Sequence, residues 1–464
     1  MRRCDMARGK KAAKALTLEE KLEQALVPEE EQPYVIPENW CWTSVEKVSI
    51  VVTGGTPSKK NPEYYGDEFP FFKPSDLDAG RHVFKASEYL SKQGKNVARI
   101  IPQNSTAVCC IGSIGKCGYL EIEGTTNQQI NSAIPKFNSL YLFYFMNSDI
   151  FIKQLWSKSS ATTISIVNKT KMESCYFPLA PLLEQQRIVT RIENLFTKLD
   201  EAKEKAQSVI DGFELRKSAI LHKAFTGELT EQWRKKHGVG LESWISVFLS
   251  DVCKVNPKKL DTKNLPDDLE VSFFPMSSLS ETYGEITEPQ TKLLKEVRTG
   301  FTNFLEGDVV FAKITPCMEN GKSAIIGKLV NNIGYGTTEF YVLRCEKKIY
   351  NRYLYHLVRD QYFRDQAKAV MTGAVGQQRV PKDFMETYPL KLPTVIEQHE
   401  ICRILDEIFF KEMKIKQAAE SVLAQIDTMK KAILARAFRG ELGTNNPSDE
   451  NAIELLKKVL AEKN

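Results

Sequence analysis

Residues 320–323, Asn-Gly-Lys-Ser, end like a nucleotide-binding loop, in which backbone N–H groups and a lysine hold phosphate oxygens. That chemistry needs another glycine five positions before Gly321, and Pro316 stands there. The backbone that would cradle the phosphates is therefore missing. Residues 112–116, Gly-Ser-Ile-Gly-Lys, fail in the same way, and we expect them to form a hairpin turn.

The tetrapeptide Asn61-Pro62-Glu63-Tyr64 shares three of its four residue types with the Asn/Asp-Pro-Pro-Tyr/Phe loop of amino-methyltransferases. Glu63 replaces the second proline of that loop. No glycine-rich strand-turn-helix that could hold a methyl donor precedes it. The sequence therefore argues against a methyltransferase site.

Ten cysteines and five histidines are spread along the chain without the spacing of a metal site. No two cysteines form a Cys-x-x-Cys pair, and there is no His-Glu-x-x-His sequence. Cys109 and Cys110 lie in an apolar run with no histidine nearby, which favours a core position over a nucleophile. We expect no catalytic residue, no metal and no cofactor, and we expect the reduced thiols of a cytoplasmic protein.

The composition predicts a folded protein of two to four domains. Its 464 residues are 42% hydrophobic and 27% charged, which is enough apolar material for real cores. No apolar run approaches the ~20 residues that span a bilayer, and the N-terminus lacks the apolar segment of a signal peptide. The net charge of +5 permits nucleic-acid binding without indicating it.

The elements that would position any site repeat along the chain with an offset of 213 residues. Residues 184–229 and 397–442 align without a gap and share 18 of 46 residues. Both segments open with Glu-Gln and close with Ala-Phe-x-Gly-Glu-Leu. Such self-similarity implies an ancestral duplication.

Each copy of the repeat carries apolar residues at alternating spacings of four and three, which is typical of a coiled coil rather than of two amphipathic helices in unrelated cores. We predict two uninterrupted helices of about 40 residues, roughly 60 Å long, with C-cap glycines at Gly227 and Gly440. One charged residue interrupts each series, Arg216 in the first copy and Glu412 in the second. The predicted helix seam consists of Ile188, Ile192, Leu195, Leu199, Val209 and Phe213, and of Ile401, Leu405, Ile408, Val422, Ile426 and Ile433.

A region of about 150 residues with short apolar runs and turn residues precedes each helix, which predicts an α/β or α+β globule. Strands are expected at 45–52, 107–111, 118–122 and 175–179, and at 271–274, 308–314, 323–326, 339–343 and 387–392. Helical stretches are expected at 141–158 and 353–370. The predicted domains are an N-terminal tail with a short helix (1–36), a first globule (37–180), a first long helix (181–229), a second globule (230–393), a second long helix (394–442) and a C-terminal linker and helix (443–464).

The sequence resembles the specificity subunit of type I restriction-modification enzymes over nearly its whole length. The resemblance rests on GGTPSKKNPEYYGDEFPFFKPSDL (54–77), GDVVFAKITPCMENGKSAI (307–325), GYGTTEFYVLR (334–344), MTGAVGQQRVPKDF (371–384) and the repeated helical blocks, including PLLEQQRI (181–188). The second block departs from the family pattern at Thr394-Val395-Ile396. The resemblance implies two target-recognition domains separated by two antiparallel helices that form a coiled coil, with a pseudo-two-fold repeat.

The resemblance also implies the partners. A member of this family binds double-stranded DNA at a split, asymmetric sequence, and its helices dock two adenine methyltransferase subunits. The complete complex adds two ATP-dependent restriction subunits. A slide of about one heptad between antiparallel helices would place Arg216 opposite Glu412, and such a charge pair fixes register. Alternatively, each side chain points to solvent or to a partner.

If the family's DNA-reading role holds, bases are read by Arg, Lys, Asn and Gln, while half or more of the hydrogen bonds go to phosphate and sugar. Gln377, Gln378 and Arg379 follow a turn containing Gly373 and Gly376, which suits close approach to a groove. The other candidate contacts are Thr56, Lys59, Lys60, Lys73, Ser75, Asp76, Gln128, Gln129 and Asn131 in the first globule, and Lys258, Lys259, Lys313 and Thr315 in the second.

Three alternatives stay open at this point. The chain could be the reader of a methyltransferase-only complex, an enzyme fused to its own reader, or a helical scaffold that binds only protein. An enzyme needs a complete catalytic motif, and we find none. A scaffold does not need two large globules before matching helices.

Overall fold

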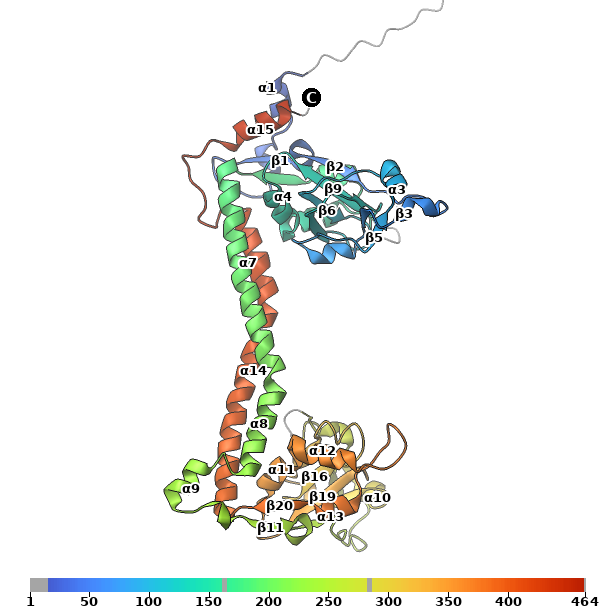
Figure 1. Ribbon diagram of the computed structural model, residues 1–464, viewed down its shortest axis with the longest axis vertical. Coiled ribbons are helices and arrows are strands. Elements are labelled where there is room, and N and C mark those ends of the chain that lie inside the picture. The colour runs from blue at the N-terminus through green and yellow to red at the C-terminus, as the bar shows by residue number, and fades with distance from the viewer. Residues whose placement is uncertain (1–15, 161–164, 282–285, 463–464) are drawn as a thin grey trace, which may run out of the picture. The chain divides into compact units, whose positions relative to one another are not determined.

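The computed structural model describes residues 16–160, 165–281 and 286–462. The chain divides into two compact units, which are Met1–Lys205 with Val422–Asn464 (unit 1) and Ala206–Ser421 (unit 2). Each unit holds one globule of strands and helices and one stretch of two packed helices (Figure 1). The predicted α+β class is confirmed. The predicted order of globule, helix, globule, helix is also present along the chain.

The globule of unit 1 contains two four-stranded sheets and a separate strand pair. Its strands are β1 (Cys41–Ser44), β2 (Ser49–Thr53), β3 (Tyr65–Gly66), β4 (Phe69–Phe72), β5 (Glu88–Leu90), β6 (Ser105–Cys109), β7 (Cys117–Leu120), β8 (Thr125–Thr126), β9 (Ile130–Pro135) and β10 (Tyr176–Leu179). One sheet has the antiparallel order β2-β9-β6-β7, and the other has the order β3-β5-β4-β8 with β4 and β8 parallel. The pair β1-β10 joins the beginning of the globule to its end.

Short helices complete this globule, namely α2 (Val45–Val48), α3 (Lys92–Val97), α4 (Ser139–Met146), α5 (Asp149–Lys158) and α6 (Lys169–Glu173). The single helical stretch predicted over 141–158 is two helices, because the Ser148 hydroxyl accepts a hydrogen bond from the Phe151 N–H and begins a new helix. The strand predicted over 45–52 is also wrong in its first half. Val45 and Val48 are buried on one helical turn, and β2 begins at Ser49.

The turn predicted at 112–116 is confirmed between β6 and β7. Gly112 and Gly115 have φ angles of 79° and 87°, which glycine adopts without a steric penalty. Cys109 and Cys110 are buried here, at 0% and 2% exposure, as their apolar context predicts.

The globule of unit 2 repeats most of this topology. Its strands are β11 (Ile245–Phe248), β12 (Cys253–Val255), β13 (Glu270–Phe274), β14 (Gln290–Leu293), β15 (Thr302–Phe304), β16 (Val309–Ala312), β17 (Ser323–Ile325), β18 (Gly334–Gly336), β19 (Phe340–Cys345) and β20 (Pro389–Leu392). The sheet β12-β19-β16-β17 matches β2-β9-β6-β7 in order and direction, and the parallel pair β13-β18 matches β4-β8. The globules differ at the edges of the second sheet, which in unit 2 has the order β14-β13-β18-β15. The pair β11-β20 matches β1-β10. The duplication therefore extends to the globules, whereas the gapless sequence repeat covers only the helices.

The helices of this globule are α10 (Leu294–Val297), α11 (Asn351–Arg359), α12 (Gln361–Ala369) and α13 (Lys382–Thr387). Helix α9 (Glu231–His237) lies beside the first turn of α14, where Arg234 binds Glu397. The helical stretch predicted over 353–370 is two helices, which meet at Asp360. The same break occurs at Ser148 in unit 1, so it belongs to the repeated fold.

Two segments from the chain ends pack together in unit 1. Helix α1 (Leu18–Glu23) contacts α15 (Ala452–Ala461), and Figure 1 shows them side by side. Thr17 and Glu20 form the predicted capping box. The first 15 residues of the predicted tail lie outside the described residues.

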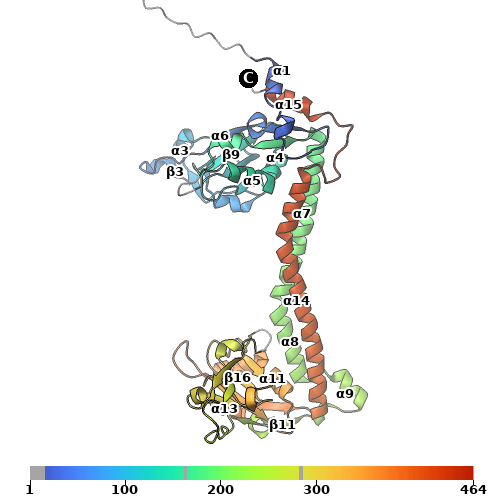
Figure 2. The ribbon, with the colours of Figure 1, turned by 180° about the vertical axis from the view of Figure 1, so that it is seen from behind.

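The long helices are α7 (Leu182–Asp211), α8 (Phe213–Thr226) and α14 (Val395–Ala437), and Figure 2 shows α7 and α8 beside α14. In unit 1, α7 and α14 run antiparallel, since Asp200 binds Lys430 at 2.6 Å while Ile188 and Ile192 share a core with Leu434 and Phe438. In unit 2, α8 and α14 also run antiparallel, because Arg216 binds Glu412 and Phe213 lies under Lys416.

The first long helix has one local irregularity, at Gly212 between α7 and α8, whereas α14 continues for 43 residues through the aligned Gln425. Helical hydrogen bonds still cross this point, from the Gly212 N–H to the Ser208 carbonyl and from the Arg216 N–H to the Gly212 carbonyl, both at 3.0 Å. Glycine is a weak helix former, which accounts for the irregularity. Gly227 and Gly440 have φ angles of 85° and 75°, as expected after helix ends.

The predicted seam is largely buried, with one correction. Val422 is 42% exposed and does not belong to it, because two packed helices bury only a narrow stripe and leave residues at its margin in water. The buried seam residues are Ile188, Ile192, Phe213, Ile401, Leu405 and Ile426, and the half-buried ones are Leu195, Leu199, Val209, Ile408 and Ile433.

Candidate nucleic-acid interface

A buried glutamate anchors each long helix to its globule. In unit 1, Glu184 of α7 accepts hydrogen bonds from the Trp40 indole N–H at 2.7 Å and from the Asn445 amide at 2.8 Å. Burial raises the pKa of the Glu184 carboxyl above its ordinary value, and these hydrogen bonds oppose the rise. Gln185 donates to the Ala180 carbonyl at 2.8 Å. The Glu-Gln pair that opens the sequence repeat is thus a structural joint.

The same joint occurs in unit 2 with a charged partner. Glu397 of α14 accepts hydrogen bonds from Trp244 at 2.9 Å and from Thr230 at 2.7 Å, and it binds the Arg234 guanidinium at 2.7 Å. Arg234 and Glu397 are 5% and 0% exposed. Near the start of each globule, a tryptophan therefore hydrogen-bonds a glutamate on the first turn of a long helix. This contact fixes the globule to the helix.

The structure brings two candidate segments of unit 1 together. Gly54 packs so closely on β8 that a Cβ would lie 2.1 Å from the Asn127 carbonyl oxygen, so only glycine fits. The next residues, Gly55 and Thr56, lie along the 126–128 loop, where Thr56 Oγ1 hydrogen-bonds the exposed Gln128. Lys59 and Lys60 continue this exposed surface.

The fold itself uses other candidates of unit 1. Asp76 accepts hydrogen bonds from the Lys73 N–H at 2.7 Å and the Ser87 N–H at 3.0 Å, and Lys73 forms an ion pair with Glu88. Asn131 is 3% exposed and accepts a hydrogen bond from Thr53. We no longer propose Asp76 and Asn131 as DNA contacts, because their side-chain oxygens already accept hydrogen bonds from other residues of the protein. Ser75 is exposed and Gln129 is half-buried.

In unit 2, the candidates Lys313, Thr315 and Gln378 meet at one place. The Thr315 N–H donates to the Gln378 carbonyl at 3.0 Å, and the Gln378 N–H donates to Thr315 Oγ1 at 3.2 Å. The Val380 N–H donates to the Lys313 carbonyl at 2.9 Å. These bonds tie the segment after β16 to the segment before α13.

Arg379 is engaged by an acid that sequence reasoning missed. Its guanidinium donates to both carboxylate oxygens of Glu339 at 2.9 Å. The Arg379 hydrogen bond lowers the pKa of the Glu339 carboxyl below its ordinary value. Only the register of β19 against β16 brings position 339 next to position 313, so no local motif pointed to it.

A polar cavity of about 280 Å³ lies beside this ion pair. Lys259, Lys313, Asn303 and Thr338 contribute to its lining. Lys259 Nζ donates to the Phe301 carbonyl at 2.7 Å, and Lys258 is exposed next to it. The cavity brings together lysines from two separate segments, Lys259 and Lys313, which is a suitable arrangement for phosphate or base-edge contacts.

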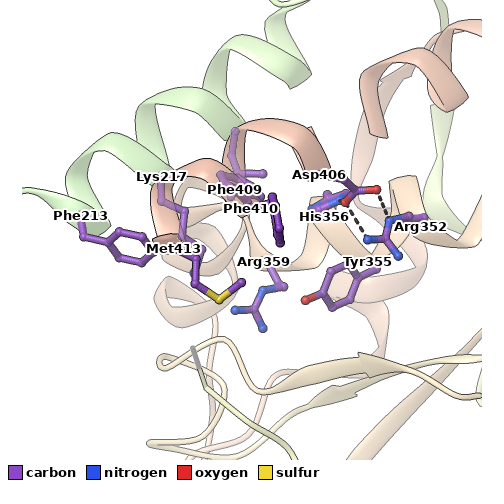
Figure 3. Close-up of a pocket in the computed structure, with 11 residues that line it drawn as sticks. Phe213, Lys217, Arg352, Tyr355, His356, Arg359, Asp406, Phe409, Phe410 and Met413 are labelled. Atoms are coloured by element: carbon purple, nitrogen blue, oxygen red, sulfur yellow. Dashed lines mark hydrogen bonds and ion pairs between the residues drawn. The ribbon is translucent and has the colours of Figure 1, made fainter. Parts of the chain in front are cut away.

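The helix pair of unit 2 carries a different kind of hollow. A cavity of about 340 Å³ opens between α8, α11 and α14, with Phe213, Phe409, Phe410 and Met413 around it (Figure 3). Arg352 and His356 of α11 face Asp406 at its edge. Sequence reasoning did not single out this cavity, although Phe409 repeats Phe196 of the first copy.

The lysine in this cavity is unusual. Burial lowers the pKa of Lys217 to about 8, with Arg359 as the next cause. The equivalent position in unit 1 is Lys430, which binds Asp200 at 2.6 Å in a more polar hollow beside Phe196. Lys217 also has an acidic partner, Glu214 at 3.6 Å, but it lies in an apolar cavity, whereas Lys430 lies in a more polar one.

A family model for the type I restriction modification DNA specificity domain matches residues 37–210 and 242–423. These two matches cover more than half of the chain. The chain belongs to this family. The matched ranges begin close to the predicted starts of the two globules and run into the long helices. Membership confirms the resemblance that the sequence motifs indicated.

Curated relatives of this specificity-domain protein are specificity subunits. The EcoEI specificity subunit of Escherichia coli is 31% identical over 264 residues, which are 48% of this chain and 44% of that protein. The chain therefore matches less than half the length of that relative. The StySPI specificity subunit of Salmonella potsdam is 22% identical over 452 residues, which are 92% of this chain and 96% of that protein.

Solved structures show the same fold. The HsdS subunit from Thermoanaerobacter tengcongensis aligns with a TM-score of 0.63 and 20% identity, over 89% of this chain and 100% of that one. Within the described residues, no helix is both long and apolar enough to cross a membrane. The same residues contain no group of three or more His, Cys, Asp or Glu side chains arranged to hold a metal ion.

Proposed function

We propose that this protein is the non-catalytic DNA-reading subunit of a type I restriction-modification complex. Each globule reads one half of a split, asymmetric sequence in double-stranded DNA. The observation that carries the proposal is the duplicated topology with different polar side chains at equivalent loops. Unit 1 presents Thr56 and Gln128 where unit 2 presents Lys259 and Thr338. One scaffold with two different surfaces suits an asymmetric target.

The long helices are proposed as the docking surface for two adenine methyltransferase subunits. Apolar side chains on both helix stretches are exposed to solvent. A partner protein that packs against the helices would bury this apolar surface. The exposed side chains include Leu183, Val422 and Met429 in unit 1, and Leu215, Phe410 and Ile415 in unit 2. Two ATP-dependent restriction subunits complete the proposed complex, which works in the cytoplasm.

The test is reconstitution with an adenine methyltransferase subunit of a type I system from the same host. We expect sequencing of methylated DNA to show one split motif with a fixed spacer. Omitting this chain should abolish methylation at that motif. The purified chain with methyl donor alone should transfer no methyl group. Methylation by the chain alone would overturn the non-catalytic role, and methylation at scattered sites by the pair would overturn the reading role.

A further inference from the structure

Residues 372–379 form a projecting hairpin in unit 2, called here the arm. Two backbone hydrogen bonds close it, from the Thr372 N–H to the Arg379 carbonyl at 3.0 Å and from the Arg379 N–H to the Thr372 carbonyl at 2.8 Å. The Gln377 N–H donates to the Ala374 carbonyl at 2.9 Å and forms the turn. All residues from 372 to 377 are exposed.

The base of the arm is fixed from two sides. Thr315 hydrogen-bonds the backbone of Gln378 through its own N–H and its hydroxyl. The two carboxylate oxygens of Glu339 accept hydrogen bonds from Nε and Nη2 of Arg379. Arg379 also donates to the Gln377 carbonyl at 3.0 Å. The arm is thus a constrained hairpin rather than a free loop.

The tip carries two side chains of definite chemistry. Val375 is 99% exposed, so its methyl groups have no protein partner on a constrained turn. Gln377 lies two residues away and is also exposed. In the major groove an amide pairs with the N6 and N7 edge of adenine, and an apolar side chain contacts the thymine methyl group. Together the two side chains match one face of an A·T pair.

We propose that the arm enters the DNA major groove and that Val375 and Gln377 select an A·T pair in the half-site read by unit 2. This inference rests on the proposed DNA-reading function. A two-stranded ribbon has the width that the major groove admits. Arg379 is a positioning residue in this arrangement, because Glu339 already occupies its guanidinium.

Unit 1 has the same base. Ile166 bridges to Ser160 and to Ile111, as Arg379 bridges to Thr372 and to Ile314. Ile166 stands where unit 2 has Arg379, so no equivalent ion pair holds it. The ion pair with Glu339 is therefore specific to the arm of unit 2.

The experiment uses the complex with its methyltransferase and the DNA motif established as above. Each A·T pair of the second half-site is changed in turn to carry deoxyuridine, which lacks the thymine methyl group. At the A·T pair read by the arm, we expect the deoxyuridine substitution to lower the affinity of the wild-type complex about 3- to 10-fold. The V375A complex should bind the thymine and the deoxyuridine DNA with the same reduced affinity. Q377A should relax the motif at that position or its neighbour. Val35→Ala is the matched control, since Val35 is 91% exposed in unit 1.

A charge exchange tests the role of Arg379. R379E and E339R should each broaden the motif, and the double variant should restore it in part with an unchanged salt dependence of binding, because a carboxylate at position 379 cannot donate to the Gln377 carbonyl. If Arg379 contacted phosphate, R379E would lower the salt slope by about one, and the double variant would not recover.

The outcomes separate the two proposals. If the wild-type complex methylates no defined motif, the DNA-reading function fails. If it methylates a split motif that V375A and Q377A leave unchanged, the arm proposal fails alone. Loss of the first half-site in these variants would also overturn it.

Discussion

The carboxylates of Glu184 and Glu397 hold equivalent joints with different partners. Glu184 accepts hydrogen bonds from neutral groups, whereas Glu397 faces the buried guanidinium of Arg234. Removing one member of a buried ion pair leaves an uncompensated charge, while a buried carboxylate with neutral donors tolerates an amide better.

We therefore expect E397Q to destabilise unit 2 by about 3–5 kcal/mol. The matched E184Q variant should cost about 1 kcal/mol in unit 1, because the glutamine oxygen still accepts from Trp40. Denaturant unfolding of the whole chain, followed by a probe in each unit, measures both values. Equal losses at the two positions would contradict this account of the joint.

Lys217 is the second residue whose environment makes a prediction. Its pKa of about 8 in the folded protein lies below the ordinary 10.5, so the folded state binds fewer protons than the unfolded state between these values. Lys217 therefore contributes a rise in stability with pH across that window, and its contribution stays at its lower level below about pH 8, whereas the raised pKa values of buried cysteines such as Cys253 and Cys402 contribute a fall above about pH 9. K217M should remove the rise and stabilise unit 2 at pH 7 by about 1–3 kcal/mol.

The aligned Lys430 supplies the control. Its ammonium binds Asp200, so K430M removes an ion pair at the surface and should cost about 0.5 kcal/mol. Thermal unfolding from pH 7 to 10 distinguishes the two lysines. If the wild type and K217M showed the same pH dependence of stability, the account of Lys217 would be refuted.

At the scale of elements, the helix pair of unit 2 is registered by a charge pair. Arg216 Nε lies 2.9 Å from the Glu412 carboxylate, as the one-heptad slide predicts. Arg216 also donates to the Val209 carbonyl at 3.0 Å, and a Cβ on Gly212 would lie 2.6 Å from its guanidinium. The glycine that interrupts the first helix therefore leaves room for this arginine.

We expect R216E and E412R each to destabilise the helix pair by about 0.5–1 kcal/mol, because each places like charges together. The exchanged double variant should recover most of that loss. A double-mutant cycle by denaturant unfolding measures the coupling. A coupling energy near zero would mean that apolar packing alone sets the register.

At the scale of the whole molecule, we propose that the helices act as a ruler for the spacer between half-sites. Two half-sites on one face of DNA lie about 34–36 Å apart, which is one helical turn. Inserting four residues near Ala202 should lengthen the preferred spacer or abolish binding, while the half-site bases stay the same. The control is an equal insertion at the exposed Gly238, outside the long helices. Changed half-site bases with an unchanged spacer would contradict the ruler.

Exchanging residues 37–180 for the same region of a relative tests the division of labour between the globules. We expect one half-site to change and the other to persist, because in the proposed function each globule reads through its own loops. Sequencing of methylated sites decides the outcome. If both halves changed, the two regions would not be independent readers.

Much of the architecture could be predicted because it follows from local patterns. The 3-4 apolar spacing identified the long helices, and the short apolar runs identified most strands, including β6, β13 and β16. An error occurred where a single residue overrides a pattern, because Ser148 caps a new helix within an apolar stretch.

The sequence by itself determined the duplication and the order of globules and helices, because both depend on residues repeated at regular spacing along the chain. The tertiary structure decided that Arg216 faces Glu412 rather than solvent, because the pair depends on the register between two helices. Only the tertiary structure decided which candidates remain available to DNA. Strand register places Glu339 against Arg379, and in a turn the Asp76 carboxylate accepts a hydrogen bond from a backbone N–H. Val375 and Gln377, by contrast, are exposed to solvent. Sequence shows which side chains can read a base, but contacts between distant segments decide which of them are free to do so.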